Sequence, residues 1–582
     1  MSKPKQPNRG ESPSRPNVFS LLSPYRLMIT FLVVFALLSN GINLLIPKII
    51  SKGIDAYSTG HFEFRTVITE FLIASFVIFF FTYLQSIVQT YASERVARDL
   101  RSRLSEKISK QSYSYILKTN PSKLLTNLTS DIDSIKMFVS MAVVTIFSSI
   151  FMIVGTCTLL LQINYKLAVP IIATIPVIGG TFFIVLRRVR VLFKRSREVI
   201  DWLNRVINES IMGSAIIRVL NSQQAEYHKF IEANTNSRNI GLGILRLFAA
   251  LIPIVTFVSN IGMITILMLG GHFVITGEMS LGDFAAFNSY LALLIFPIIM
   301  IGFMSNIMAQ ASASYGRINE VLESPDPQEN GTLKNSLRGN IELVDISLSY
   351  GDKPVLKNIS FSVKGGTRVA IIGPTAAGKS QLLNLLTDLI KPDIGKILFD
   401  GEDIESFDKE SFRRQIGFVL QDSVIFNMSL RENIAFSDKV TDESLEKAIQ
   451  TAELQDFVDS LPDKLNTVVS ERGTSLSGGQ QQRIMLARAL ALNPKILLLD
   501  DFTARVDRKT EKKILSNLEL NYPDLTLLSI TQKIASIKHF EQIILLMEGE
   551  IIAKGTHADL MESCTEYVQI YNSQRSTSHY EL

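Results

Sequence analysis

An eight-residue stretch, Gly373-Pro374-Thr375-Ala376-Ala377-Gly378-Lys379-Ser380, combines glycines, a lysine and a serine in an order that suits phosphate binding. It follows the apolar run Val369 to Ile372 and precedes a helix that we expect to begin at Gln381. This context is that of the Walker A motif, in which backbone N–H groups and a helix N-terminus face the phosphates. Lys379 would supply a positive charge to the β and γ oxygens, and Ser380 would hold Mg²⁺. The stretch therefore predicts a site for ATP with Mg²⁺.

Two carboxylates end a second apolar run. The segment Lys495 to Asp501 carries four apolar residues before Asp500 and Asp501. Such a run is typical of a strand buried on both faces of a parallel sheet, whose C-terminal edge would carry the carboxylates. We expect Asp500 to hold Mg²⁺ through water at that edge.

A third motif, Leu476-Ser477-Gly478-Gly479-Gln480, precedes an apolar helix. Two glycines and a serine at a helix start form a second anion-binding nest. Because the first loop already accounts for the phosphates of its own site, this nest is expected to serve another site.

The elements around these motifs predict an α/β domain. From about Asn340, short apolar runs alternate with amphipathic segments, as parallel βα units do. The proline-rich and polar segment 324–339 before it is typical of a linker. We expect the domain to cover residues 340–575, followed by a tail of residues 576–582.

The first half of the chain has the composition of a membrane domain. The 582 residues are 47% hydrophobic, and the mean hydropathy is +0.23. Six charge-free apolar runs are each long enough to cross a bilayer, which takes about 20 helical residues. They are Leu27 to Pro47, Phe71 to Ser93, Met137 to Tyr165, Leu167 to Leu186, Leu247 to Thr276 and Phe284 to Gly316. Only a turn around Lys166 separates the third run from the fourth. The sequence predicts an all-α transmembrane domain over residues 23–323.

Basic residues predict how the spans are oriented. Lysines and arginines gather in two long segments, Glu94 to Lys136 and Arg187 to Arg246, which are also expected to continue the spans as helices. Since such residues accumulate on the cytoplasmic side, both segments, both termini and the α/β domain are predicted to be cytoplasmic. Residues 1–22 read as a cytoplasmic tail, because no short apolar core with a cleavage site precedes Arg26.

Charge and cysteine content narrow the function classes. The net charge of +4 is small for this length, so nucleic acid is not expected as a partner. Two cysteines are too few for a disulfide framework. The spans carry asparagines and glutamines but no acid or base, so a strongly charged substrate site is not predicted.

With the Walker motifs, the pentapeptide Leu476 to Gln480 resembles the signature of ATP-binding cassette (ABC) proteins, and the six preceding spans resemble a bacterial exporter half-transporter. The resemblance covers nearly the whole chain after the tail. It implies an integral protein of the bacterial inner or plasma membrane. In this family two cassettes pair head to tail, so that each ATP lies between one chain's Walker A and the other's signature. This pairing would explain why the anion-binding motif Leu476 to Gln480 has no phosphate to bind in its own chain's site.

Further residues match family positions one by one. Tyr350, at a strand end, resembles the aromatic residue that stacks on adenine, although an ordinary strand-end tyrosine is the alternative. Gln421 resembles the Q-loop glutamine, which would contact Mg²⁺ and the attacking water. Ser470 to Gly473 resembles the exporter X-loop, and Asp507 stands where the D-loop aspartate is expected. The segments that look like the two coupling helices, with plain amphipathic helix as the alternative, are Ser112 to Thr126 and Ile207 to Leu220.

Two departures from the family fall on one composite site. Asp501 replaces the glutamate that acts as general base, and its carboxylate is about 1.5 Å shorter in reach. Gln532 stands where the family has the switch histidine, so it could hydrogen-bond a γ-phosphate but not act as a cation. Ala376, where glycine is common, and Gln381, where serine or threonine is common, are milder departures.

These departures, beside an intact signature, resemble the degenerate-site subunit of a heterodimeric exporter. The expected partner is a different half-transporter, with a homodimer as the alternative. The expected function is ATP-driven export, or flipping, of hydrophobic or amphipathic compounds or lipid, with slow hydrolysis at the chain's own site. A regulatory subunit or channel gated by ATP binding is the competing interpretation.

Overall fold

The computed structural model describes residues 18–327, 331–351, 353–469, 473 and 476–578. By its internal contacts the chain divides into two units. The helical unit comprises Met1–Lys110 and Thr119–Pro325. The α/β unit comprises Gln111–Lys118 and Asp326–Leu582.

Among the described residues of the first half, six continuous helical stretches are long and apolar enough to cross a membrane. Four of the six predicted runs lie wholly within them, and the runs Met137 to Tyr165 and Leu247 to Thr276 extend one or two residues past a helix end, which confirms the all-α membrane domain. The stretches are Ser20–Ser58, Phe64–Ser109, Pro121–Ile163, Tyr165–Met212, Gln223–Ile275 and Leu281–Leu322. The second is one helix of 46 residues, about 69 Å long at 1.5 Å per residue. It therefore extends well beyond a hydrocarbon core of about 30 Å.

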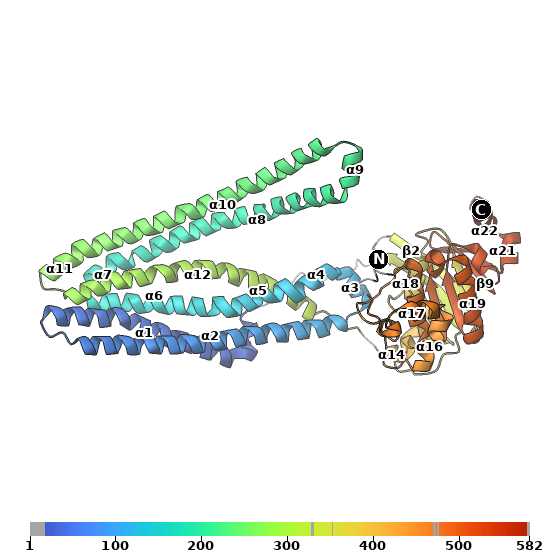
Figure 1. Cartoon of the computed structure of the whole chain (residues 1–582), viewed down its shortest axis with the longest axis horizontal. Coiled ribbons are helices and arrows are strands. Elements are labelled where there is room, and N and C mark those ends of the chain that lie inside the picture. Colours follow the sequence, from blue (N-terminus) through green and yellow to red (C-terminus); the bar gives the residue numbers. More distant parts are fainter. Residues whose placement is uncertain (1–17, 328–330, 352, 470–472, 474–475, 579–582) are drawn as a thin grey trace, which may run out of the picture. The chain divides into compact units, whose positions relative to one another are not determined.

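The individual elements of this half follow the chain in order (Figure 1). They are η1 (Ser20–Tyr25), α1 (Arg26–Ser58), α2 (Phe64–Ser109), α3 (Tyr113–Thr119), α4 (Pro121–Thr126), η2 (Asn127–Asp131), α5 (Ile132–Met137), η3 (Phe138–Ala142), α6 (Val143–Ile163), α7 (Tyr165–Ile172), α8 (Thr174–Met212), α9 (Ser214–Val219), α10 (Gln223–Thr265), η4 (Ile266–Gly270), α11 (Gly271–Ile275) and α12 (Leu281–Leu322).

Two turns between spans are fixed by side-chain caps, and the first is the predicted turn around Lys166. Asn164 Oδ1 accepts hydrogen bonds from the N–H groups of Lys166 and Leu167, which starts α7. Ser280 Oγ accepts from the N–H of Asp283 and starts α12. Such caps satisfy N–H groups that have no partner inside the helix.

The two predicted coupling helices are shorter than the predicted segments. In the first, Asn120 has φ +69° and Pro121 opens a new helix, so α3 ends at Thr119. Proline at a first helical position cannot continue the preceding helix. In the second, residues 207–212 complete α8, and the separate helix α9 follows Gly213.

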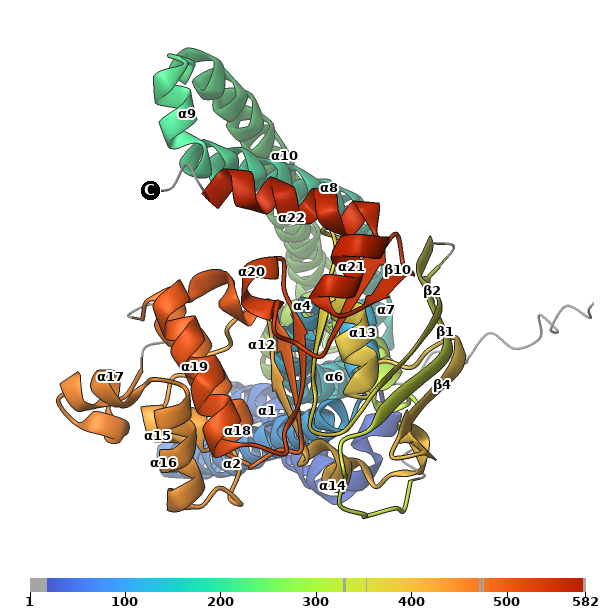
Figure 2. The same cartoon turned by 90° about the vertical axis from the view of Figure 1, so that its right-hand side faces the viewer.

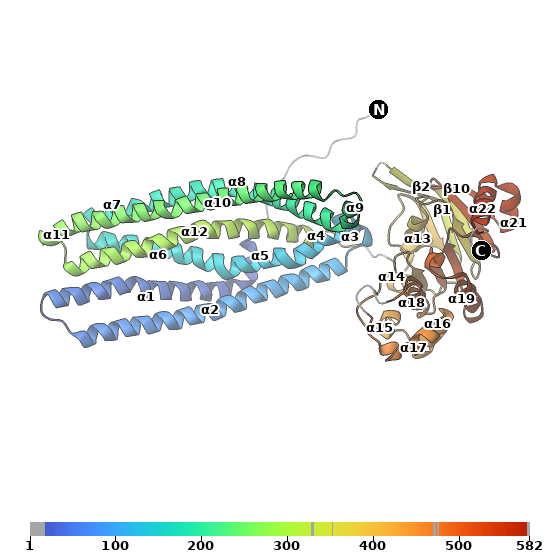
Figure 3. The same cartoon turned by 45° about the horizontal axis from the view of Figure 1, so that its top comes forward.

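The helices of this unit pack as long neighbours. Figures 1 and 3 both show α8 beside α10, and α6 beside α12, while α1 and α2 form another pair. In Figure 1 the α9 end of the α8–α10 pair diverges from the other helices.

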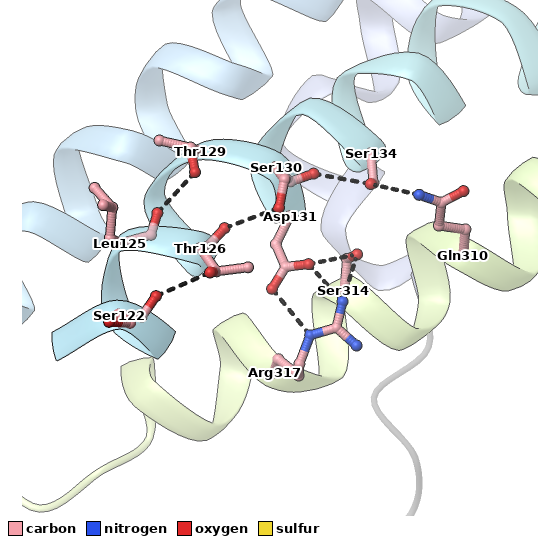
Figure 4. Close-up of polar contacts among 10 residues, drawn as sticks. All are labelled: Ser122, Leu125, Thr126, Thr129, Ser130, Asp131, Ser134, Gln310, Ser314 and Arg317. Atoms are coloured by element: carbon pink, nitrogen blue, oxygen red, sulfur yellow. Dashed lines mark hydrogen bonds and ion pairs between the residues drawn. The ribbon is translucent and has the colours of Figure 1, made fainter. Parts of the chain in front are cut away.

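A polar seam joins α12 to the π-helical turn η2 and to α5 (Figure 4). Asp131 is only 2% exposed, and its carboxylate accepts from Ser314 Oγ at 2.9 Å and from Arg317 Nε at 3.0 Å. Arg317 Nη2 donates to the same carboxylate. One turn further along, Gln310 Nε2 donates to Ser134 Oγ at 3.1 Å. A buried carboxylate of this kind is stable only with such partners.

The α/β unit alternates strands and helices as predicted. Its strands are β1 (Ile341–Tyr350), β2 (Lys353–Val363), β3 (Arg368–Ile372), β4 (Ile394–Phe399), β5 (Glu402–Asp403), β6 (Ile416–Val419), β7 (Ile496–Asp500), β8 (Thr526–Ile530), β9 (Gln542–Met547) and β10 (Glu550–Gly555). Its helices after the linker are α13 (Lys379–Leu386), η5 (Ile404–Ser406), α14 (Lys409–Arg413), α15 (Leu430–Ile434), α16 (Asp442–Thr451), α17 (Gln455–Ser460), η6 (Lys464–Asn466), α18 (Gly478–Leu490), η8 (Phe502–Arg505), α19 (Arg508–Asn521), α20 (Ile534–Ile537), α21 (His557–Ser563) and α22 (Thr565–Ser578).

Two sheets organise this unit, and their strands can be followed in Figure 2. The larger has the order β10-β9-β3-β8-β7-β6, and β9 to β6 are parallel. The smaller, β2-β1-β4-β5, is antiparallel. The predicted strands Val369 to Ile372 and Ile496 to Leu499 are buried throughout. Because β3 and β7 both flank β8 in parallel, the loops after them open at one sheet edge.

Candidate nucleotide site

The loop after β3 has a backbone path that needs glycine at two points. Gly373 has φ +157°, and a Cβ there would lie 1.9 Å from Leu546 O. Gly378 has φ +95°, and a Cβ there would lie 2.7 Å from Leu356 Cδ2. Ala376 also lies in the left-handed region, at φ +66°. Its Cβ costs about 1 kcal/mol in that conformation.

Lys379 begins α13, two residues earlier than predicted. The residue is only 8% exposed, and its Nζ donates to Gly373 O at 2.9 Å and to Pro374 O at 2.7 Å. Burial lowers the pKa of the ammonium, while Asp500 and Asp501 oppose that change. The helix has no side-chain N-cap, because its cap residue is Gly378. Lysine and helix N-terminus therefore form a compact anion-binding arrangement.

Asp500 ends β7 and is 5% exposed. Burial raises the pKa of its carboxyl above the ordinary value, whereas the Ser380 hydroxyl and Lys379 lower it and Asp501 raises it further. A carboxylate held in this way gains from a nearby cation.

Asp501 leaves the strand in the left-handed conformation, with φ +45°. Its N–H donates to Ile530 O at 2.9 Å, which ties it to the end of β8. Burial raises the pKa of its carboxyl, and Lys533 and Lys379 lower it.

The loop after β8 carries Gln532, whose side chain is exposed. The next residue, Lys533, donates from Nζ to Thr503 O at 2.7 Å, and its N–H donates to Thr531 Oγ1 at 3.1 Å. This loop therefore lies against the segment that follows Asp501.

These residues share one cavity of about 420 Å³. It brings together most of the predicted positions of this chain's own site: Tyr350, Thr375, Ala376, Ala377, Gly378, Lys379, Ser380, Gln421, Asp500, Asp501 and Gln532. Gln381, Val355 and Ile530 complete the lining. Of these three, only Gln381 was singled out from the sequence; Val355 and Ile530 are ordinary strand residues that carry no signal. Gly373 and Pro374 do not line the cavity and instead accept the Lys379 hydrogen bonds.

The motif Leu476 to Gln480 lies elsewhere in the unit. Among the described residues that line the cavity, none comes from it. Ser477 caps α18, accepting from Gln480 N–H at 3.3 Å while its own N–H donates to Gln480 Oε1 at 2.8 Å. A Cβ on Gly478 would lie 3.2 Å from Arg505 Cδ. The helix start at this motif is therefore held by its own capping box and does not contribute to this chain's own cavity.

Comparisons with known proteins agree with this arrangement. Residues 29–298 match the family profile for the ABC transporter transmembrane region, and residues 356–504 match the profile for the ABC transporter. The ABC transporter ATP-binding protein YfiB of Bacillus subtilis (strain 168) is 33% identical over 564 residues, covering 95% of this chain and 98% of that protein. The chain belongs to the ABC transporter family.

Two further relatives bear on the type of ABC transporter. An ATP-dependent lipid A-core flippase of Syntrophus aciditrophicus (strain SB) is 31% identical over 497 residues, 85% of this chain and 83% of that one. The structure of a bacterial Atm1-family ABC exporter with ATP bound aligns with a TM-score of 0.78 at 24% identity, over 95% and 99% of the two chains. The fold is that of an ABC exporter half-transporter, six apolar helices followed by an ATP-binding cassette.

Membership of the ABC family implies ATP, typically with Mg²⁺, and the cavity fits both. Among the described residues no cluster of three histidine, cysteine or acidic side chains could bind a metal alone. Asp500, the Ser380 hydroxyl and the Gln421 amide offer oxygen ligands of the kind Mg²⁺ takes when phosphates and water complete its shell. Ser380 and Asp500 interact directly.

The predicted Q-loop residue, Gln421, is linked to the helix that begins within the predicted signature, α18. Gln421 is exposed and lines the cavity, and its carbonyl accepts from Nε2 of the buried Gln482 at 2.9 Å. Gln482 lies on α18, two residues beyond the signature. A shift of the segment around Gln421 would therefore displace α18, and a shift of α18 would displace that segment.

The expected D-loop aspartate caps a helix, whereas the expected X-loop is only partly among the described residues. Asp507 caps α19 by accepting from the N–H groups of Thr510 and Lys509, and the first of these bonds lowers the pKa of its carboxyl most. Its expected role toward the partner's nucleotide stays a prediction. Of the X-loop, residues 470–472 lie outside the described residues, while Gly473 O accepts from Gln481 Nε2 at 2.8 Å.

Proposed function

We propose that this chain is one half of a heterodimeric ABC exporter whose own composite site binds ATP and hydrolyses it slowly. The observation that carries the proposal is that Asp501 and Gln532 line the same cavity as the Walker residues. The intact signature lies apart from them. Both departures thus affect one site, and the signature is left free to complete a partner's site.

The chemistry of that site follows from its residues. Lys379 and the N-terminus of α13 bind phosphate oxygens, and Tyr350 offers its ring to adenine. Mg²⁺ would neutralise charge on the phosphates. Asp501 is one methylene shorter than the family's glutamate, and a misplacement of about 1 Å can slow a reaction about 10²-fold. Gln532 can donate a hydrogen bond to a γ-phosphate but carries no charge.

The transported compound is proposed to be hydrophobic or amphipathic, with lipid included. The uncharged spans support this, and so does the similarity to a protein named as a lipid A-core flippase. The clusters of lysine and arginine support a cytoplasmic position for the cassette.

Two experiments test the proposal. The chain is expressed alone and with candidate partner half-transporters, and ATPase activity is measured after purification. A homodimer with full ATPase activity would contradict the heterodimer. Vectorial transport of labelled lipid in proteoliposomes, with wild-type partner and with a partner lacking ATPase activity, separates an exporter from a channel gated by ATP binding. Only the exporter loses transport with the inactive partner.

A further inference from the structure

The last helix of the cassette holds the loop that carries Gln532. Gln574 lies on α22 and is half-buried. Its Nε2 donates to Gln532 O at 2.5 Å, and its Oε1 accepts from Ile534 N–H at 3.0 Å. One amide thus binds the backbone on both sides of Lys533, using its donor and its acceptor together.

Helix α22 is itself firmly attached to this part of the cassette. Tyr567 is fully buried in the same apolar core as Ile534 and Ile537 of α20. His557 Nδ1 and Tyr567 OH lie 2.8 Å apart, and Lys538 Nζ donates to Tyr571 OH at 2.9 Å. Figure 2 shows α20, α21 and α22 at the same end of the cassette. Gln574 therefore comes from a packed element rather than from a loose tail.

The loop has a second anchor on its opposite side. Lys533 Nζ donates to Thr503 O, three residues after Asp500. Between these two anchors the Gln532 side chain remains exposed and lines the cavity. Because its carbonyl is bound by Gln574, the rotation of the Gln532 backbone, and with it the direction of the side chain, is restricted.

We propose that Gln574 is a positioning residue for the contact between Gln532 and the γ-phosphate of ATP, which makes α22 part of the nucleotide site. This inference rests on the proposed function, in which Gln532 meets the γ-phosphate. Only ATP has that phosphate. Loss of the two Gln574 hydrogen bonds therefore weakens ATP binding and leaves ADP binding unchanged.

The experiment measures the preference of this chain for ATP over ADP. The full-length chain, with its partner, is labelled on ice with a photoreactive ATP analogue and Mg²⁺, and ATP or ADP competes for labelling of this subunit. Gln574→Met keeps the length of the side chain and removes both hydrogen bonds. We expect the ATP preference to fall about 3- to 10-fold, the size of one hydrogen bond. Asn572→Ala, an exposed position on the same helix, is the matched control and leaves the preference unchanged.

Two further variants separate positioning from general stability. Gln574→Glu keeps the acceptor for Ile534 N–H but sets a carboxylate against Gln532 O, so the preference falls at least as far as with methionine. Combining Gln574→Met with Gln532→Ala lowers it no further than Gln532→Ala alone, because both act through one contact.

Three results would overturn the inference. Equal weakening of ATP and ADP binding by Gln574→Met indicates a structural role only. An unchanged preference in Gln574→Met, when Gln532→Ala lowers it, removes the role of Gln574 and leaves the proposed function standing. An unchanged preference in Gln532→Ala contradicts the γ-phosphate contact, and the inference falls with it, while the heterodimer is judged separately by co-purification and ATPase activity.

Discussion

Tyr350 OH donates a hydrogen bond to Gln381 Oε1 at 2.9 Å. This bond attaches the expected adenine platform, at the end of β1, to the first turn of the helix that follows the phosphate loop. The ring is half exposed and lines the cavity. Gln381 occupies a position where serine or threonine is common, and neither would reach as far. The departure at Gln381 therefore has a structural role in orienting Tyr350.

A first prediction concerns this pair. Tyr350→Ala is expected to weaken ATP binding by about 1–3 kcal/mol, because a base loses its stacking partner. Tyr350→Phe and Gln381→Ala each cost about 1 kcal/mol or less, because only the hydrogen bond is lost. Equilibrium ATP binding measures all three. Tyr227→Phe, an exposed tyrosine of α10, is the control, and equal effects of Tyr350→Ala and Tyr350→Phe would contradict stacking.

A second prediction concerns pH and stability. The pKa of Asp500 is raised by burial, so the folded protein binds this proton more tightly than the unfolded chain does. Stability is then lost as the pH rises from the ordinary aspartate value of about 3.9 through the raised value. Asp500→Asn is expected to raise the Tm of the nucleotide-free protein at pH 8 and to raise it less at pH 5, while weakening Mg²⁺-ATP binding. Thermal unfolding at both values checks this, and a lower Tm at pH 8 would refute it.

A third prediction concerns hydrolysis at the chain's own site. Asp501→Glu alone and Gln532→His alone should each change the single-turnover rate by less than about threefold, because residues that act as a unit are not additive. Together they should raise it by at least about tenfold. Asp501→Asn with Gln532→His is the control without a base. An equal gain in that control would show that the carboxylate is not the limiting group.

A fourth prediction concerns the polar seam of Figure 4. Arg317→Met leaves the buried Asp131 carboxylate without its cation, which costs about 3 kcal/mol of unfolding free energy. Adding Asp131→Asn should recover part of that loss. Lys229→Ala breaks an exposed pair with Glu226 and should cost less than about 1 kcal/mol. Denaturant unfolding of the purified transporter compares the three variants. Equal losses of unfolding free energy in Arg317→Met and Lys229→Ala would refute a special role for the seam.

Much of the fold follows from patterns that extend over many residues. Six uncharged runs predicted the spans, and the apolar tetrads before Gly373 and Asp500 predicted buried parallel strands. Both patterns report burial directly. The cavity around Lys379 was predictable for the same reason, since a strand, a glycine loop and a helix fix one another's geometry.

Local breaks and distant partners were harder to predict. The end of α3 carries the dipeptide Asn120-Pro121, which is a turn signal that the predicted segment overlooked. The hydrogen bonds of Gln574 left no signal at all, because a glutamine on a polar C-terminal helix is an ordinary surface residue until its partner 42 positions away is known. The sequence showed only that Gln381 stands where serine or threonine is common. What it contacts depends on how β1 lies against α13.

The ion pair of Asp131 and Arg317 has a mechanical consequence. Asp131 follows α3 and α4 in the chain, and Arg317 lies five residues before the end of α12, beyond which the chain continues toward the cassette. The segment that follows α4 and the last turns of α12 are therefore tied together by one ion pair within the helical unit. Tilting α12 or the η2–α5 segment alone would pull the buried Asp131 carboxylate away from its cation. At this end α12 and the η2–α5 segment are expected to move as one body, whereas the α9 end of the α8–α10 pair lies apart from them.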